Sequence, residues 1–267
     1  MEPETVLSLA RSAVAEVSSR TTDLLGGLPH LEARIPGATW SVREAAVHLV
    51  NFAAMYQDIA VGMPSPRLSV ARDHVAWDND RRITDVAETD PDKVAALVAD
   101  TVDRFLDEAT GRPATQTVTF HCGLPLNLDA LVCVYLGELI LHGYDIATAV
   151  AAPWPIDPMH AQLVLYGYGP CFGLVADEQR TRGLTAGYRI DLRDGPAFTV
   201  RFVDGEYRLE DAASGAVDAT ISADPVALLM VGSGRLRVSA AIALGLLTVG
   251  GDRPELAIGF PDLFLYP

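Results

Sequence analysis

Hydrophobic residues recur at helical spacing over the first half of the chain and at alternating spacing over much of the second half. Helical periodicity marks four long segments, 3–26, 42–61, 91–110 and 128–149. Their number and their lengths favour a four-helix bundle. From about residue 186 onward, short alternating runs are separated by Gly, Pro and Asp, a pattern typical of strands and turns. The sequence therefore predicts an α+β protein that begins with a helical bundle.

The second half is predicted to form a smaller α+β domain with an antiparallel sheet. The runs YRIDLR, FTVRFV and EYRLED read as consecutive strands, and Asp204-Gly205 between the last two is a strong hairpin signal. The run DATISAD predicts a further strand. Asp224-Pro225 then predicts a helix start, because Asp is a good N-cap and Pro favours the first helical position. The last stretch, VSAAIALGLLTVGGDRPELAIGF, reads as helix, turn and helix.

A proline-rich segment separates the two halves. Pro153, Pro155 and Pro158 each disfavour helix in the preceding residue, so we expect domains at 1–152 and 158–267. Within the first domain, the stretch from Arg67 to Asp90 reads as a long polar connection at the mouth of the bundle. The run TQTVTFHCGLPLNL predicts a short extended pair.

Charge and composition exclude several classes of partner. Asp and Glu number 35 against 20 Lys and Arg, giving a net charge of −15, so we expect no nucleic-acid partner and no membrane partner. The N-terminal segment is acidic and amphipathic, unlike an export signal, and no transmembrane helix is expected. The three cysteines lack CxxC spacing, which favours small buried side chains in a reducing, cytoplasmic location.

Two of the predicted helices carry isolated polar residues on otherwise apolar surfaces. The helix near residue 42 begins with a capping box of Ser41 and Glu44, and His48 is the one titratable residue in the apolar run that follows. In the segment 128–149, Glu138 and His142 lie one turn apart on the same stripe. A buried carboxylate is unfavourable unless it is neutralised, paired or bound to a metal.

Together, His48, Glu138 and His142 make a set of two histidines and one carboxylate, the ligand count of a catalytic zinc site with one open position. Asp145 lies three residues beyond His142 and could orient its ring by accepting the free N–H. Two alternatives remain open at this point. Glu138 and His142 could form a plain hydrogen bond, and all three residues could form a metal-free polar cluster.

Other candidate sites are weaker. His121 and Cys122 would face opposite sides of a strand, which disfavours joint ligation. The run Gly232-Ser233-Gly234-Arg235 follows a helix instead of opening one, which disfavours a phosphate site, and no G-x-S-x-G motif supports a serine hydrolase.

The motifs TWSVREAAVHL and LGELILHGYDIATAVAAPWPID resemble the mycothiol-dependent maleylpyruvate isomerase family. The resemblance implies a DinB-like bundle and a divalent metal, typically zinc, held by His48, Glu138 and His142. The stretches DATISADPVALLMVGSGRLRV and LTVGGDRPELA resemble the sterol-carrier-protein-like C-terminal domain of that family.

The resemblance also implies a reaction. Mycothiol would serve as the thiol cosubstrate, and its thiolate would add to a small-molecule electrophile, giving cis-trans isomerisation or thiol S-transfer. An arginine of the C-terminal domain assists catalysis in the isomerases, and Arg235 is our candidate, with Arg237 and Arg201 as alternatives. The competing hypothesis is a non-catalytic protein that binds an apolar ligand and keeps the metal as a structural staple. The oligomeric state stays open.

Overall fold

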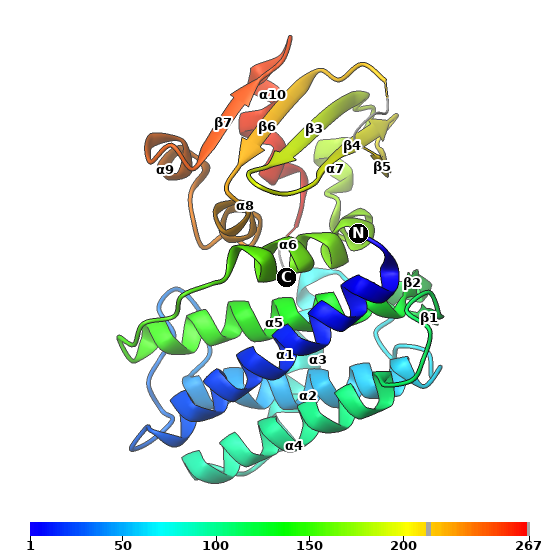
Figure 1. Ribbon diagram of the computed structural model, residues 1–267. Helices are drawn as coiled ribbons and strands as arrows, with labels where there is room; N and C mark the ends of the chain where they lie inside the picture. Colours follow the sequence, from blue (N-terminus) through cyan, green and yellow to red (C-terminus); the bar gives the residue numbers. More distant parts are fainter. Residues whose placement is uncertain (212–214, 266–267) are drawn as a thin grey trace. The chain divides into compact units, whose positions relative to one another are not determined.

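The computed structural model describes residues 1–211 and 215–265, and the chain divides into two compact units, Met1–Ile156 and Asp157–Pro267. Helices dominate the first unit, and a sheet flanked by short helices makes up the second (Figure 1). The α+β class predicted from the sequence is confirmed.

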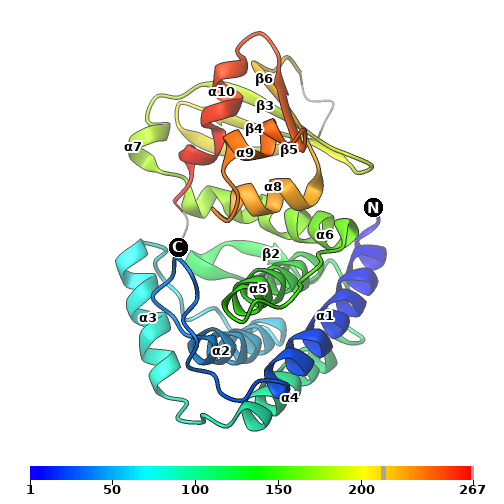
Figure 2. The same cartoon turned by 90° about the vertical axis from the view of Figure 1, so that its left-hand side faces the viewer.

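The first unit is a bundle of α1 (Pro3–Gly26), α2 (Val42–Ala60), α4 (Pro91–Ala109) and α5 (Leu128–Ala149), as the periodicity predicts. Helix α1 packs against α4 and α5, and α2 packs against the same two helices from the other side (Figure 2). Among the described helices, α5 alone is long and apolar enough to cross a membrane by length and composition, but 78% of that window is buried within the structure. Its apolar surface is therefore used for packing.

Local capping fixes where these helices begin. The Ser41 side chain accepts a hydrogen bond from the Glu44 backbone N–H, and the Glu44 carboxylate accepts one from the Ser41 N–H at 2.6 Å, so the predicted capping box of α2 is confirmed. The Asp90 side chain caps α4 through the Lys93 N–H in the same way.

The predicted long connection between Arg67 and Asp90 is wrong, because it contains a helix, α3 (Arg72–Thr84). This helix packs against α2. Most of its residues are polar, and the apolar positions that it buries include Val75 and Ile83, so hydrophobic periodicity is too weak to reveal it. Its buried face also contains polar side chains, Asp78 and Asn79.

A short antiparallel pair, β1 (Thr117–Thr119) and β2 (Pro125–Asn127), confirms the predicted extended pair. His121 and Cys122 do not lie on a strand, because the turn η1 (His121–Gly123) follows β1 directly and Cys122 adopts a φ of 54° there. The expectation that all cysteines are buried is wrong for Cys122, which is exposed at this turn, whereas Cys133 is buried and Cys171 is partly buried.

The second unit places its sheet next to a group of short helices. Its strands are β3 (Ala186–Leu192), β4 (Ala197–Val203), β5 (Glu206–Asp211), β6 (Ala219–Ala223) and β7 (Leu247–Gly250). Its helical elements are α6 (Pro158–Tyr168), η2 (Gly169–Val175), α7 (Glu178–Thr181), α8 (Pro225–Gly232), α9 (Val238–Ala243), α10 (Pro254–Gly259) and η3 (Phe260–Leu263).

The sheet has the order β5-β4-β3-β6-β7 and is mixed. Strands β3, β4 and β5 form the predicted antiparallel meander, but β6 pairs in parallel with β3, so the prediction of an antiparallel sheet is wrong at this pairing. The reason is topological: the chain leaves the β5 edge and returns to the far side of β3 instead of pairing beside β5. Strand β7 is a second correction, because the predicted helix-turn-helix has a strand between α9 and α10.

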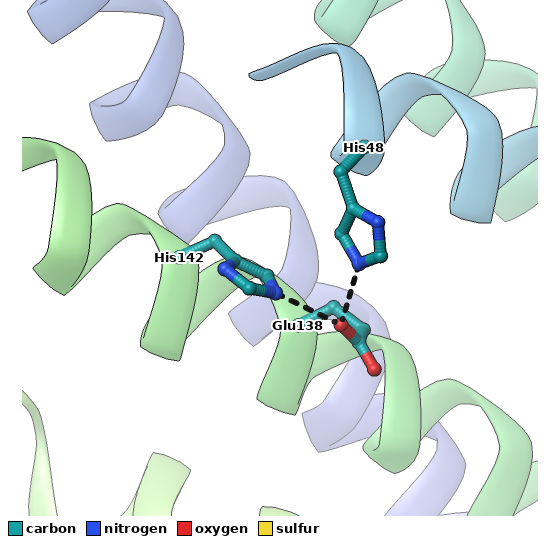
Figure 3. Close-up of side chains that lie close together, drawn as sticks. All are labelled: His48, Glu138 and His142. Carbon is teal, nitrogen blue, oxygen red and sulfur yellow. Dashed lines mark ion pairs between the residues drawn. The ribbon is translucent and has the colours of Figure 1, made fainter. Parts of the chain in front are cut away.

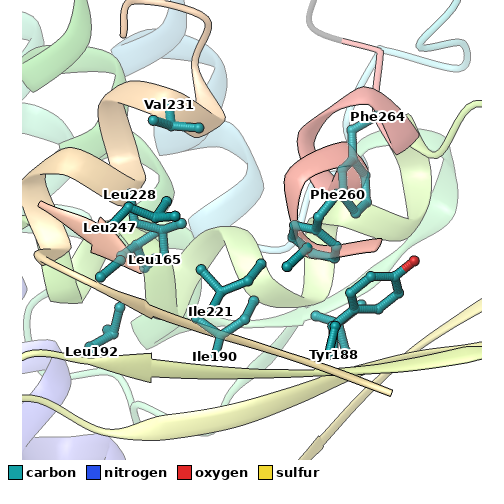
Figure 4. Packing of buried hydrophobic residues seen from close by; sticks show 14 of the residues in the cluster. Leu165, Tyr188, Ile190, Leu192, Ile221, Leu228, Val231, Leu247, Phe260 and Phe264 are labelled. Atoms are coloured by element: carbon teal, nitrogen blue, oxygen red, sulfur yellow. The ribbon is translucent and has the colours of Figure 1, made fainter. Parts of the chain in front are cut away.

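The core of the second unit lies between the sheet and these helices (Figure 4). Tyr188, Ile190 and Ile221 from the sheet meet Leu228 of α8 and Phe260 of η3 in one apolar cluster. Helix α8 begins at Pro225 with Asp224 as its N-cap, as the sequence predicts. Its residues Leu228 and Val231 belong to the apolar cluster.

Candidate metal centre

The packing of α2 against α5 brings His48, Glu138 and His142 together inside the bundle (Figure 3). His48 lies two turns into α2, whose start is fixed by the capping box. Glu138 and His142 lie four residues apart on α5, so their side chains share one helix face. The three side chains are largely buried, with exposed fractions of 5% for His48 and 18% for each of the other two.

Both histidines point a ring nitrogen at the same carboxylate oxygen. The Nε2 atoms of His48 and His142 each lie 3.4 Å from Oε2 of Glu138. The donor atoms of the three residues all lie within 4.8 Å of one another. The sequence predicts this set from two separate helices, and the packing of α2 against α5 brings the three side chains together.

This donor set fits a divalent transition metal. Two ligands bound about 2.0–2.1 Å from one tetrahedral ion lie roughly 3.3–3.4 Å from each other, close to the two nitrogen-to-oxygen distances observed here. Imidazole and carboxylate are ligands that zinc accepts, and three protein ligands leave one position for a water, thiolate or substrate. The residues present therefore fit the metal that the resemblance implies.

The electrostatics of His48 and Glu138 favour ligation. Burial lowers the pKa of His48 to about 4, so this imidazole is neutral at neutral pH, which is the form that binds metals. Burial by itself would raise the pKa of Glu138, but hydrogen bonding to His142 and His48 holds it well below its usual range. Glu138 is therefore an anion within the bundle.

A second carboxylate lies behind His142. Oδ2 of Asp145 is 3.3 Å from His142 Nδ1, the nitrogen that does not face Glu138. Burial by itself would lower the pKa of His142, but Asp145 and then Glu138 raise it above its usual value. Asp145 thus lies beside the free ring nitrogen of His142, as its spacing predicts, and can fix the orientation of that ring.

Aromatic side chains surround the two histidines. The centre of the Trp40 ring lies 4.8 Å from the centre of the His48 ring and 5.8 Å from that of the His142 ring. The centre of the Phe52 ring lies 4.1 Å from that of the His48 ring. The sequence identifies Trp40 only as a residue flanking the capping box. Its contact with both histidines depends on the long-range packing of α2 against α5, so no local signal reveals it.

The other candidate residues have separate locations. His121 is buried and its Nδ1 lies 2.6 Å from Ser65 Oγ, while Cys122 beside it is exposed, so the two do not form a shared site. Arg235 lies in the second unit, in the turn after α8, where its Nη1 donates to the Ser233 carbonyl at 3.2 Å. Its catalytic role stays a prediction.

Comparison with known proteins gives family matches over both units. The mycothiol maleylpyruvate isomerase N-terminal domain family matches residues 14–147, half of the chain, and this match includes all three candidate ligands. The SCP-2 sterol transfer family matches residues 174–259. A search of curated proteins finds no match to this chain.

Solved structures with the same fold include two of a mycothiol-dependent maleylpyruvate isomerase. One of them, a histidine-to-alanine mutant, has a TM-score of 0.55 and 13% identity, and the other has a TM-score of 0.51 and 15% identity. Each similarity covers 94% of this chain and 93% of the matched chain. At these identities the likeness establishes the fold, and the sequence match over residues 14–147 establishes the family: the chain belongs to the mycothiol-dependent maleylpyruvate isomerase family.

Proposed function

We propose that this protein is a metal-dependent enzyme that uses mycothiol to modify a small electrophile, by cis-trans isomerisation or by thiol S-transfer. The observation that carries the proposal is the convergence of His48, Glu138 and His142, with both Nε2 atoms 3.4 Å from one carboxylate oxygen. The arrangement supports the proposal because the two imidazole nitrogens and the carboxylate oxygen converge at distances that suit ligands of one ion.

In this proposal His48, Glu138 and His142 hold the metal, with zinc or another divalent ion as the occupant. When bound, the ion lowers the pKa of a thiol, and the thiolate is the nucleophilic form. Glu138 supplies the negative charge that offsets the ion, and Asp145 holds the His142 ring in place through Nδ1. Trp40 and Phe52 limit the access of water around His48.

The reaction then depends on the electrophile. A thiolate adds to an activated carbon–carbon double bond, which leaves a single bond that can rotate. Expulsion of the thiolate from the resulting carbanion restores the double bond, giving the isomerised product and the cosubstrate. Uptake of a proton by the carbanion instead keeps the new carbon–sulfur bond and gives a thiol conjugate. Arg235 is our candidate for assisting this step by holding a negative charge on the substrate. We further propose that the protein works in the cytoplasm, in keeping with its sparse cysteines, and on a small-molecule partner, in keeping with its net charge of −15.

The test is thiol-dependent turnover by the zinc-reconstituted full chain. Maleylpyruvate is supplied with and without mycothiol, and the products are separated by chromatography and identified by mass spectrometry. We expect turnover only with the thiol present, and a loss of more than about 100-fold in Glu138→Gln, which keeps the side-chain shape but removes the anionic ligand. Recovery of the trans isomer with free thiol indicates isomerisation, and a thiol adduct indicates S-transfer.

A matched control is His30→Gln, because His30 is exposed and pairs with Glu32 away from the buried triad. This variant should keep the wild-type rate. Turnover that does not depend on mycothiol, or a Glu138→Gln variant as active as the wild type, would contradict the proposal.

A second candidate function is non-catalytic binding of an apolar small molecule, with the metal as a structural staple. It is favoured by an apolar cavity of about 50 Å³ within the second unit, whose lining includes Leu165, Ile190, Leu228, Val231, Phe260 and Phe264 (Figure 4). Saturable binding of a fluorescent fatty acid, lost on Ile190→Asp, together with no turnover under any thiol, would favour this function over the enzyme.

A further inference from the structure

Next to the metal centre, the first unit buries a cluster of polar side chains that the proposed reaction does not yet use. The residues are Ser65, Arg67, Asp78, Asn79 and His121, and each is at most 9% exposed. Ser65 Oγ lies 2.6 Å from His121 Nδ1 and accepts a hydrogen bond from the Arg67 backbone N–H at 3.2 Å. Side chains of these types are seldom buried without a structural or a binding role.

Arg67 is the central cation of this cluster. Its Nη2 donates to Asn79 Oδ1 at 2.7 Å and lies 3.7 Å from Asp78 Oδ2. Its Nε is also buried, yet among the described residues it has no hydrogen-bond partner. A guanidinium held on one side by α3 thus retains an unused donor, and buried donors are normally paired.

The charge around Arg67 is unbalanced. Asp78 lies 3.5 Å from Arg81 Nη2 and 2.9 Å from Arg82 Nε, in addition to its contact with Arg67. Within the described part of the chain, one carboxylate therefore pairs with three guanidinium groups. Arg67 is the most deeply buried of the three cations and shares its one carboxylate with the other two, so a further anion beside it would be favourable.

Arg67 also reaches the metal centre through a shared neighbour. Its guanidinium carbon lies 5.0 Å from the centre of the Phe52 ring, and that ring lies 4.1 Å from the His48 ring. The Phe52 ring thus has the guanidinium group on one contact and the His48 ring on another. Arg67 lies on the segment that leads into α3, the candidate ligands lie on α2 and α5, and all of them belong to the first unit.

We propose that Arg67 recognises a carboxylate of the electrophile by paired hydrogen bonds from its guanidinium group. This inference rests on the proposed function, because it places the carboxylate on the molecule that the thiol attacks. Arginine suits this role because its planar guanidinium group matches both oxygens of a carboxylate. Asn79 and Asp78 act as positioning residues that hold the guanidinium group.

A purely structural arginine that ties α3 to α2 would have the same burial and the same partners. The two roles differ in what they predict for binding. A structural arginine affects the stability of the fold, whereas a recognition residue affects the affinity for carboxylates at an unchanged metal content.

The experiment is calorimetric titration of maleate into the zinc-loaded full chain, without thiol, for the wild type and Arg67→Met. We expect maleate to bind the variant at least tenfold more weakly, with zinc content and circular dichroism unchanged. Arg81→Met is the matched control, because Arg81 pairs with the same Asp78 but is 54% exposed, and it should keep the wild-type affinity. The neutral analogue maleamide should bind the wild type at least tenfold more weakly than maleate.

The inference is overturned if folded, zinc-loaded Arg67→Met binds maleate as tightly as the wild type, or if the wild type does not distinguish maleate from maleamide. Should Arg67→Met fail to fold, Arg67→Lys decides, because lysine keeps the charge but not the planar group. Severalfold weaker maleate binding by Arg67→Lys supports the inference, and equal affinity overturns it. Arg67-dependent binding of maleate without thiol-dependent turnover would refute the proposed function alone, whereas turnover with Arg67-independent binding would refute this inference alone.

Discussion

The interiors of the two units differ in chemistry. Between α2 and α5 the bundle buries two imidazoles and a carboxylate, and it buries a guanidinium beside them. The core of the second unit is aliphatic and aromatic, built from residues such as Ile190, Val200, Phe202 and Ile221. Buried polar groups are tolerated where they have partners, so the bundle interior is organised around specific pairings and the second core around shape and apolar contact.

The difference indicates where chemistry and binding are located. A group that transfers protons, ligates a metal or attracts an anion must be polar, and in the bundle such groups lie around α2 and α5. The apolar cavity of the second unit offers a place for an apolar group but few polar side chains to act on it. We therefore expect changes in the second core to alter stability, and changes between α2 and α5 to alter metal binding and activity.

The largest expected effect comes from truncating the second core. Phe202 is fully buried and its ring lies 5.9 Å from that of Tyr207 and 6.2 Å from that of Phe264. Phe202→Ala should lower the free energy of unfolding by about 3–5 kcal/mol, measured by urea denaturation, because it leaves a cavity. Ile258→Ala is the control, since Ile258 is 53% exposed and should change stability by no more than about 0.5 kcal/mol.

Zinc content of folded Phe202→Ala should equal that of the wild type, because every candidate ligand lies in the bundle. Loss of zinc from this variant would show that metal binding in the bundle depends on the core of the second unit.

Overpacking of the bundle should have the next largest effect. A Cβ atom on Gly143 would overlap the ring of Trp154, whose Nε1 donates to the Ile140 carbonyl. Gly143→Ala should therefore destabilise the protein by up to about 3 kcal/mol in thermal unfolding, although alanine is the better helix former. The double variant with Trp154→Ala should remove the steric penalty. A Gly143→Ala variant as stable as the wild type would show that the Trp154 ring does not pack there.

Asp145→Asn tests how the bundle orients its ligands. The carboxylate lies 3.3 Å from His142 Nδ1, and loss of such a partner weakens metal binding by about 10–100-fold. The affinity for zinc is measured by competition with a chelator of known affinity. Asp58→Asn, an exposed change on α2, is the control and should leave the affinity unchanged. Equal affinities for all three proteins would show that Asp145 does not support the ligand.

The smallest expected effect is at the start of α2. Ser41→Ala removes the N-cap hydrogen bond and should lower stability by about 1 kcal/mol at neutral pH. The pKa of Glu44 is lowered: its burial acts to raise it, but hydrogen bonds to Ser41 and the charges of Arg34 and Arg43 outweigh this.

The pH dependence of this cap follows from the lowered pKa. A depressed folded-state pKa means that the stabilisation by Glu44 is fully present above the usual glutamate pKa of 4.5 and is lost as the pH falls through the folded-state pKa. The stability difference between the wild type and Glu44→Gln should therefore shrink in acid, followed by urea denaturation at a series of pH values. A difference that grows as the pH falls would contradict the capping role.

Much of this arrangement could be predicted from the sequence where local signals are strong. The capping box at Ser41 and the Asp204-Gly205 turn act over a few residues, and the long apolar helices have clear periodicity, so these features are confirmed. The set of His48, Glu138 and His142 was also predictable, because each polar residue interrupts an apolar surface that must be buried.

The features that could not be predicted depend on contacts between distant segments. Helix α3 is stabilised by burial of a few side chains against α2 and has little apolar periodicity of its own. The parallel pairing of β3 with β6 is a choice of topology that no local pattern specifies. Arg67, beside Phe52, likewise contacts Asn79 and Asp78 of α3, and no local signal in the sequence specifies these contacts.

The most direct test of the central claim is the metal content of the purified protein, measured by plasma mass spectrometry for the wild type, His48→Ala and Glu138→Ala prepared identically. The account predicts about one divalent transition-metal ion per wild-type chain and loss of that ion from both variants, with folding checked by circular dichroism. A wild-type protein that stays free of metal after incubation with zinc, or variants that retain the ion at full occupancy, would contradict it.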